Sequence, residues 1–236
     1  TAPAWLIPAA EPGDRWVIQV HGRAVRRQEA LRAVPVFRDA GFTSLLVSYR
    51  NDGDAPPSRD GRYALGDSEW RDVDAAMRFA LDHGARELVL MGWSMGGATV
   101  LQALTRSERS DAVIGVVLDS PVVDWVTALH FQAALNRLPW IVGAGALALL
   151  TSAWARPLTG SAQPIDFARM DLVARARELD RPLLLLHSDD DGYVPVTASQ
   201  ALAVARPDIV QFEEFTTARH TKLWNHDPER WTGLVR

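Results

Sequence analysis

The chain contains no cysteine among its 236 residues. Disulfide bonds, thiolate nucleophiles and zinc sites built from cysteine are therefore excluded. Lysine is almost absent as well, since Lys222 is the only one and every other basic side chain is arginine. The formal net charge is −4, so the chain lacks the basic field that would hold nucleic acid. We expect no nucleic-acid partner.

A recognisable targeting segment is also lacking. No signal peptide is visible, and the sequence begins at Thr1 instead of methionine, which leaves open that an upstream segment has been removed. We expect a cytoplasmic protein, or a membrane-associated or exported one if such a segment existed. Repeats, linkers and low-complexity tracts are missing too, so we predict a single domain over residues 1–236. The sequence carries no signature of an oligomeric state.

Short apolar runs alternate with helical patterns over most of the chain. Strands are predicted at residues 4–8, 15–20, 43–48, 88–91, 112–118, 183–187 and 209–215, and helices at residues 29–40, 68–83, 171–179, 197–205 and 227–236, with another beginning at residue 98. Because the strands are uniformly apolar and joined through helices, we predict an α/β fold with a mostly parallel central sheet and helices on both faces.

One turn in the middle of the chain carries a nucleophile motif. Residues 92–96 read Gly-Trp-Ser-Met-Gly, after a predicted strand and before a predicted helix, which is the context of a nucleophile elbow. So tight a turn presses the backbone of Gly92 against that of Gly96, and a Cβ at either position would clash. We expect a strained Ser94 at the tip with its hydroxyl exposed. The amide of Met95 would point where an oxyanion forms.

A serine hydroxyl needs a base beside it, and the base needs a group that holds its tautomer. In a parallel sheet such groups lie at the carboxyl ends of the strands. Among the six histidines, His220 follows the last predicted strand and is the predicted base. His226, near the terminal helix, is the reserve candidate. His187 ends a strand, and we interpret it as a structural histidine.

Two places in the sequence offer an acid. Residues 189–191 are three consecutive aspartates after the strand at 183–187, and Asp119 follows the preceding strand. Consecutive aspartates are also typical of solvated turns and of calcium loops. A calcium loop is excluded, because the chain has Val194 and Gln200 where an EF-hand beginning at the first aspartate needs glycine and glutamate. We predict no metal and no cofactor.

Taken together, these motifs resemble the α/β-hydrolase superfamily over essentially the full chain. Serine, aspartate and histidine follow one another in the order typical of that family. Residues 187–195 resemble its H-G-x-x-D-x-x-V-P motif, which implies that Asp191 is the acid. Residues 219–225 resemble the ending found in bacterial members. Ser188 and Arg219 stand where the family has glycine.

The same resemblance implies an oxyanion hole and an activity. His21-Gly22-Arg23 resembles the family's oxyanion loop, which implies that the amide of Arg23 donates beside that of Met95. The implied activity is that of a serine hydrolase forming an acyl-enzyme on Ser94. Its expected substrates are carboxylic esters or thioesters with small, largely hydrophobic acyl groups, and its expected partner is that small molecule. A peptidase or amidase using the same residues, and a non-catalytic ligand-binding or interaction module, remain as alternatives.

The alternation of strands and helices stops between residues 122 and 170, in an apolar stretch rich in aromatic residues. We predict that residues 122–170 form a helical cap, or lid, over Ser94. Within it, Trp125, Phe131, Leu135 and Trp140 are expected to line an apolar acyl pocket, together with Trp93 of the elbow.

Part of this stretch has a composition that suggests lipid. Residues 138–155 are nearly apolar enough for a membrane span, which takes about 20 residues, but Pro139, Gly143 and Gly145 interrupt them. The stretch also lies in the middle of the predicted domain. Peripheral contact of the cap with a membrane is therefore favoured over a span, and packing of these aromatic residues on the sheet as core is the alternative.

Overall fold

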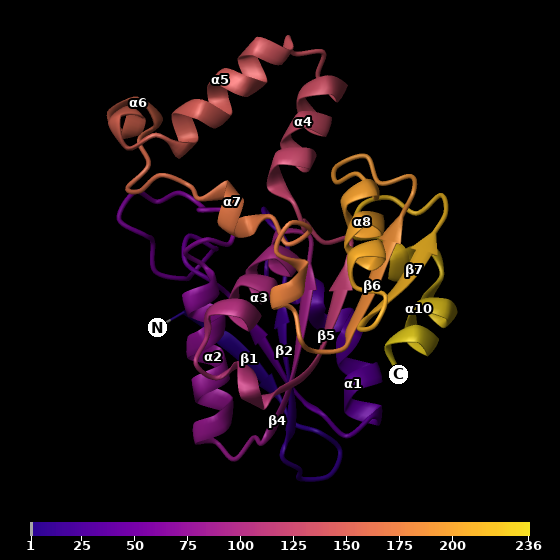
Figure 1. The fold of residues 1–236 in the computed structure, drawn as a ribbon. Coiled ribbons are helices and arrows are strands. Elements are labelled where there is room, and N and C mark those ends of the chain that lie inside the picture. The colour runs from indigo at the N-terminus through magenta and orange to yellow at the C-terminus, as the bar shows by residue number, and fades with distance from the viewer. Residues whose placement is uncertain (1) are drawn as a thin grey trace.

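The apolar runs of the sequence become the strands of one seven-stranded sheet. The computed structural model describes residues 2–236. Its strands are β1 (Ala4–Ile7), β2 (Arg15–Val20), β3 (Thr43–Val47), β4 (Glu87–Trp93), β5 (Val113–Asp119), β6 (Leu183–Ser188) and β7 (Val210–Phe215). They lie in the order β1-β3-β2-β4-β5-β6-β7 (Figure 1). Only β1 is antiparallel to its neighbour, so the predicted mostly parallel sheet is confirmed.

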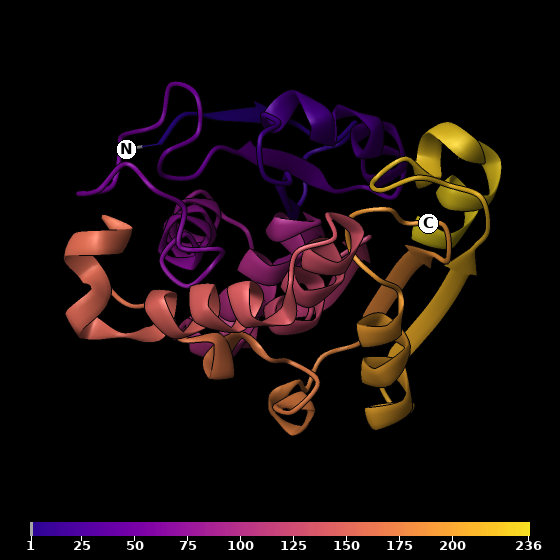
Figure 2. The same ribbon diagram turned by 90° about the horizontal axis from the view of Figure 1, so that it is seen from above.

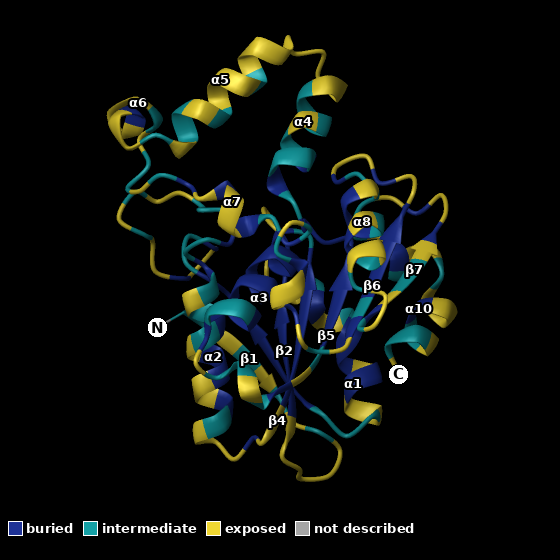
Figure 3. Ribbon diagram, in the orientation of Figure 1, coloured by how far each residue is buried: buried dark blue, intermediate teal, exposed yellow. Residues whose placement is uncertain are grey.

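Helices cover both faces of this sheet. The bounds are η1 (Arg27–Ala33), α1 (Val34–Asp39), α2 (Trp70–Asp82), α3 (Met95–Arg106), η2 (Ser110–Ala112), η4 (Ala176–Glu178), α8 (Thr197–Ala205), α9 (Leu223–His226) and α10 (Pro228–Val235). Because side chains alternate along β4, Leu88 and Leu90 pack with α2, α3 and α8, whereas Met91 packs with α1 and α10 on the other face. The strands are the most buried part of the molecule (Figure 3).

Two predicted helices differ from the structure. The one expected at residues 29–40 is instead the 3-10 helix η1 followed by α1, which has Pro35 in its first turn. Proline favours a helix start, because it lacks the amide that a continuing helix needs. The helix expected at residues 171–179 is replaced by turns and η4. The Asp171 carboxylate accepts the amides of Val173 and Ala174 as an N-cap does, but the turns that follow do not extend into an α-helix.

Residues between β5 and β6 form helices that leave the sheet. They are α4 (Trp125–Leu135), α5 (Trp140–Thr151), η3 (Ala153–Ala155), α6 (Arg156–Thr159) and α7 (Phe167–Met170). We call residues 125–165 the arm. The arm stands clear of the sheet in Figure 1 and passes over α3 when seen from above in Figure 2. Phe167 and Met170 of α7 are buried again in the body. A covering role over Ser94 stays a prediction.

Candidate active site

The turn between β4 and α3 has the strained geometry that its glycines predicted. Ser94 has φ 51° and ψ −119°, in the left-handed region that costs energy for a residue with a side chain. A Cβ on Gly92 would lie 2.5 Å from the carbonyl oxygen of Gly96, and one on Gly96 would lie 2.1 Å from that of Val20. Both distances are clashes. Glycine is therefore required at these two positions, and the turn projects Ser94 beyond the carboxyl edge of the sheet.

Three side chains from separate loops meet in one hydrogen-bonded chain. The Ser94 hydroxyl lies 2.8 Å from Nε2 of His220, and Nδ1 of His220 lies 2.7 Å from Oδ2 of Asp191. Asp191 follows β6 and His220 follows β7, so the parallel sheet delivers all three to the same edge. With Asp191 accepting from Nδ1, the Nε2 atom is free to accept the serine proton, which is the arrangement that makes serine nucleophilic.

Asp191 is held as a carboxylate acceptor. Its side chain is fully buried, and Oδ1 accepts the backbone amides of Tyr193 and Val194 at 2.8 and 2.9 Å. Burial alone would raise the pKa of Asp191, but hydrogen bonds from His187, from His220 and from the Val194 amide outweigh it and lower that pKa well below its ordinary value. The carboxyl group is therefore ionised at neutral pH and provides His220 with a negatively charged partner.

His187 has a role that the sequence reading missed. Its ring is buried, as a structural histidine should be, but Nε2 lies 3.2 Å from Oδ2 of Asp191 and 3.1 Å from the Val194 carbonyl. Nδ1 lies 2.7 Å from the hydroxyl of Ser199 on α8. The ring thus helps to orient the same carboxylate oxygen that contacts His220. The available signal was its place four residues before the acid.

The competing acid and base lie in other networks. Oδ2 of Asp119 accepts the indole N–H of Trp231 at 2.9 Å, and Oδ1 accepts the hydroxyl of Ser120 at 3.0 Å. Burial raises the pKa of Asp119. His226 is exposed, with Nε2 3.3 Å from the hydroxyl of Thr217. Neither side chain is hydrogen-bonded to Ser94 or His220, so the geometry favours Asp191 and His220.

The loop after β2 lies directly beside the serine. A Cβ on Gly22 would lie 3.2 Å from the Cβ of Ser94. The carbonyl of Gly22 accepts the hydroxyl of Tyr49 at 2.8 Å. In a trans peptide the C=O and N–H bonds point in opposite directions, so anchoring this carbonyl also orients the amide of Arg23. Met95 is the first residue of α3, where helix amides lack an intrahelical acceptor.

A buried polar cluster supports this loop. His21 lies 3.0 Å from the carboxylate of Asp52 through Nε2 and 2.8 Å from the Gly22 carbonyl through Nδ1. Burial would raise the pKa of Asp52, but hydrogen bonds from His21 and Ser48 lower it. The Tyr49 ring stacks on His21 with centroids 4.7 Å apart, and burial raises the pKa of its phenol well above the ordinary value. The tyrosine therefore stays a hydrogen-bond donor.

The five residues predicted to line an acyl pocket are not brought together. Trp93 is fully buried and faces the layer of α1 and α10, because the alternation along β4 turns it away from the elbow. The prediction is wrong for this residue. Trp125 is buried in the core on the other face, and Trp140 is 79% exposed. Phe131 is half-buried and Leu135 is exposed, both on α4 of the arm, and their role stays a prediction.

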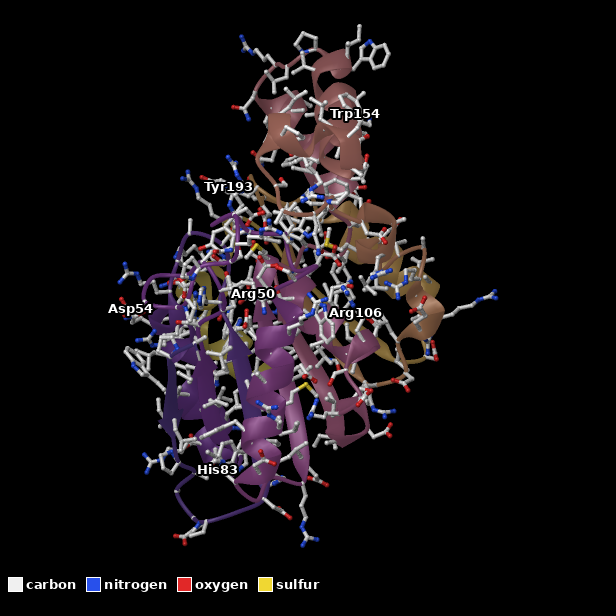
Figure 4. The ribbon with its side chains drawn as sticks, turned by 90° about the vertical axis from the view of Figure 1, so that its left-hand side faces the viewer. Arg50, Asp54, His83, Arg106, Trp154 and Tyr193 are labelled. Carbon is white, nitrogen blue, oxygen red and sulfur yellow. The ribbon has the colours of Figure 1, made fainter. Side chains whose placement is uncertain are left out.

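A contact between the arm and the acid loop was also missed. The side-chain amide of Gln132, on α4, donates to the carbonyls of Gly192 and Tyr193 at 3.2 and 2.8 Å. The Tyr193 ring lies 5.4 Å from that of His220, and it marks the base of the arm in Figure 4. Within residues 2–236, no group of three or more acidic or histidine side chains is placed to hold a metal ion.

Sequence comparison finds relatives that are longer than this chain. It is 27% identical to human protein ABHD12B over 208 residues, which are 84% of this chain and 51% of that protein. It is 26% identical over 202 residues to the uncharacterized protein YfhR of Escherichia coli strain K12, covering 84% of this chain and 61% of that protein. The chain thus spans between half and two thirds of the length of these relatives.

Solved structures share the fold at low sequence identity. An esterase of Pyrococcus furiosus matches with a TM-score of 0.70 and 18% identity, covering 100% of this chain and 88% of that one. A monoacylglycerol lipase of Paleococcus ferrophilus matches with a TM-score of 0.66 and 19% identity, covering 100% and 98%. The sequence model of the alpha/beta hydrolase family matches residues 17–232, a range that includes the elbow turn and the loops of Asp191 and His220. This chain belongs to the alpha/beta hydrolase family.

Proposed function

We propose that this chain is a serine hydrolase that cleaves carboxylic ester or thioester bonds of small, largely hydrophobic acyl substrates. The observation that carries the proposal is the hydrogen-bonded chain from Ser94 through His220 to Asp191, with distances of 2.8 and 2.7 Å. Membership of the alpha/beta hydrolase family supports it, as do structural neighbours that are themselves an esterase and a lipase.

The first half of the reaction acylates Ser94. His220 takes the hydroxyl proton on Nε2 while Oγ bonds to the substrate carbonyl carbon, and the carbonyl electron pair moves to its oxygen. The amides of Arg23 and Met95 would donate to that oxyanion, where one donor typically contributes about 10²–10³ in rate. The bond from carbon to the leaving group then breaks, and His220 returns its proton to the departing alkoxide or thiolate.

The second half releases the acid. Water loses a proton to Nε2 of His220 as it attacks the acyl carbonyl, the bond between that carbon and Oγ breaks, and Ser94 recovers its proton. Asp191 keeps Nδ1 protonated throughout, so Nε2 is the atom that exchanges the proton. No cofactor takes part in any step.

Hydrophobic acyl preference rests on the arm. Gln132 ties α4 to the loop of Asp191, and this contact supports a substrate path along the apolar residues of α4. Phe131 is half-buried there, and Leu135 is exposed. An acyl chain laid against this surface would exchange water contacts for apolar ones, which favours uncharged chains over polar ones.

A paired substrate panel tests the proposal. Acetyl, butyryl, octanoyl and lauroyl esters of p-nitrophenol are compared with leucine and alanine p-nitroanilides, using the wild-type chain and Ser94→Ala. We expect ester turnover that rises with acyl hydrophobicity and falls in Ser94→Ala below about one part in 10³. Thermal unfolding of the variant should match the wild type, because only one hydroxyl of a half-buried residue is lost.

The panel also separates the two alternatives. Faster cleavage of the anilides than of the esters would identify a peptidase or amidase that uses the same three side chains. Absence of turnover, together with absence of covalent labelling by a fluorophosphonate, would identify a ligand-binding module. Turnover that survives in Ser94→Ala would remove the serine from the mechanism.

A further inference from the structure

The arm exposes an unusual amount of apolar surface. Half of the large apolar side chains that are exposed in residues 2–236 lie within residues 135–158. Trp140, Trp154 and Leu158 are 79%, 71% and 74% exposed. Trp154 lies on the projecting helices in Figure 4, and Figure 3 shows few buried residues beyond the base of the arm. An apolar surface of this kind marks a site of interaction.

Helix α5 is apolar on every side. Its twelve residues are Trp-Ile-Val-Gly-Ala-Gly-Ala-Leu-Ala-Leu-Leu-Thr, and none of them is buried. A helix that is apolar all round normally lies in a protein core or in lipid. Leu147 and Leu150 pack against the core, but the rest of the helix surface, including Trp140, Ile141 and Val142, is left without apolar cover from this molecule.

The charge of the arm differs from that of the body. Between Asp124 and Asp166 the sequence has no acidic residue, and its two charged side chains are Arg137 and Arg156. The whole chain nevertheless carries a net charge of −4, so the body is acidic and the arm cationic. An anionic surface would attract the arm and repel the rest of the molecule, which orients the protein with the arm toward that surface.

Further arginines gather where the arm returns to the body. A cavity of ≈ 410 Å³ lies between residues 161–165 and the loop at 58–68. It is lined by Arg50, Arg59, Arg62, Arg71, Arg106 and Arg169. Arg50 and Arg106, labelled in Figure 4, are each 2.7 Å from a carboxylate, and Arg169 is 3.4 Å from that of Asp166. Asp60 accepts the amides of Arg62 and Ala162, not a guanidinium. The cavity thus holds an excess of positive charge beside the base of the arm.

The helices of the arm are short and sharply bent. No single helix in residues 2–236 is long and apolar enough to cross a bilayer. The length and apolar composition of a membrane span are reached only by two helices taken together, Trp140–Thr151 and Ala153–Thr159. These two helices are bent by 93° relative to each other. The twelve residues of α5 extend about 18 Å at 1.5 Å per residue. That length suits a helix lying in the plane of the interface, with tryptophans at the level of the headgroups.

We propose that the arm binds the surface of an anionic phospholipid bilayer. Trp140, Trp154 and the apolar residues of α5 enter the interface, while Arg137 and Arg156 contact the headgroups. A second copy of this chain is the competing occupant, but it would place one cationic arm against another. Because the arm leaves from the carboxyl edge of the sheet, docking would also turn the edge that carries Ser94 toward the lipid (Figure 1).

Vesicle flotation tests the proposal with the full chain. Vesicles of phosphatidylcholine alone are compared with vesicles that also contain phosphatidylglycerol, at low and at raised salt. The variants are Trp140→Ser with Trp154→Ser, and Arg137→Glu with Arg156→Glu. Val204→Ser on α8 is the matched control, because Val204 is 81% exposed but lies outside the arm. All five positions are exposed, so thermal unfolding of the variants should stay close to that of the wild type.

We expect the wild type and the control to float with the anionic vesicles, at least tenfold more than with phosphatidylcholine alone, and raised salt to weaken the binding. Each arm variant should lose at least tenfold. Failure of the wild type to float, or flotation of the tryptophan variant equal to that of the wild type, would overturn the proposal. So would self-association without lipid that the tryptophan variant abolishes. Ser94→Ala should float like the wild type, so this test stands apart from the proposed catalysis.

Discussion

Asp191 accepts more hydrogen bonds than any other residue of the site. His220 and His187 contact one of its oxygens, at 2.7 and 3.2 Å, and the amides of Tyr193 and Val194 contact the other. Asp119 is as deeply buried, but its partners are Trp231 and Ser120. The two aspartates therefore have separable tasks: one orients the proposed base and the other supports the fold.

Exchanging each carboxylate for an amide should separate these tasks. Asp191→Asn is expected to lower kcat/KM by roughly 10³–10⁴, because His220 loses the acceptor that holds its tautomer. Asp119→Asn is expected to lower stability by roughly 1–3 kcal/mol, because one of the two acceptor oxygens becomes an NH2 group and the hydrogen bond from Trp231 or from Ser120 is lost. Ester kinetics and thermal unfolding measure the two effects. A crippling loss of activity in Asp119→Asn, with Asp191→Asn active, would mean that the acid has been assigned to the wrong strand.

Tyr49 should matter through the amide that it orients. Its hydroxyl donates to the Gly22 carbonyl, on the opposite side of the peptide from the amide of Arg23. Tyr49→Phe is expected to lower kcat about tenfold with little change in KM, less than the loss of a whole oxyanion donor. Tyr63→Phe is the control, because Tyr63 packs edge-on against Tyr49 and donates to the Asn51 carbonyl instead. Equal effects of the two changes would point to packing, not to orientation of the oxyanion loop.

At the level of residues, side chains in continuous motifs could be predicted, whereas those that act through contacts with distant segments could not. The elbow glycines, Ser94 and His220 followed from motifs that are continuous in sequence. His187 and Tyr49 were missed as supporting residues, because their partners lie on other strands and loops. Trp93 was misplaced because strand alternation, not nearness in sequence to Ser94, decides which face a side chain occupies.

Among the elements, α4 connects the arm to the proposed site. Gln132 donates to the carbonyls of Gly192 and Tyr193, next to Asp191. These two hydrogen bonds join α4 to the loop that carries Asp191. Movement of the arm would therefore displace the loop that carries Asp191.

Removing that link should loosen both segments together. Gln132→Ala is expected to raise hydrogen exchange in the second half of α4 and at residues 192–194, with a loss of stability of about 0.5–1.5 kcal/mol for the hydrogen bonds removed. Asn136→Ala is the matched control, since Asn136 contacts only the Gln132 carbonyl within the same helix. Faster exchange in α4 alone would show that the arm and the acid loop move independently.

The strands were predicted closely because each is a short apolar run closed by polar turns. Residues 15–20 and 197–205 were predicted with the bounds that β2 and α8 have in the structure. The helix expected at 171–179 is wrong because its apolar spacing also fits the turns and the 3-10 helix η4 that the structure has there. The course of the arm could not be predicted, because its composition fits a core, a cap and a lipid surface equally well.

For the whole molecule, the low pKa of Asp191 makes the free energy of unfolding depend on pH in the acidic range. Its pKa in the folded state lies below the unfolded value of about 3.9, so the unfolded chain binds more protons between those two values. The stability contributed by the ionised group is thus fully present above about pH 4–5 and is lost as pH falls toward the folded pKa.

Acid unfolding should reveal this contribution. We expect the melting temperature of the wild type to fall more steeply below about pH 4 than that of Asp191→Asn, which has no carboxylate to protonate there. Asp190→Asn is the control, because Asp190 is exposed. An equal fall in melting temperature below about pH 4 for the wild type and Asp191→Asn would show that the hydrogen bonds do not lower the pKa of this carboxyl group.

The most direct measurement of the central claim is covalent labelling followed by mass spectrometry of the peptides. A fluorophosphonate should add one adduct per chain, on Ser94, and the labelling rate should fall by at least about 10³ in His220→Ala, because the serine then lacks its base. His226→Ala should label like the wild type. An adduct on any other residue, or undiminished labelling of Ser94 in His220→Ala, would contradict the account.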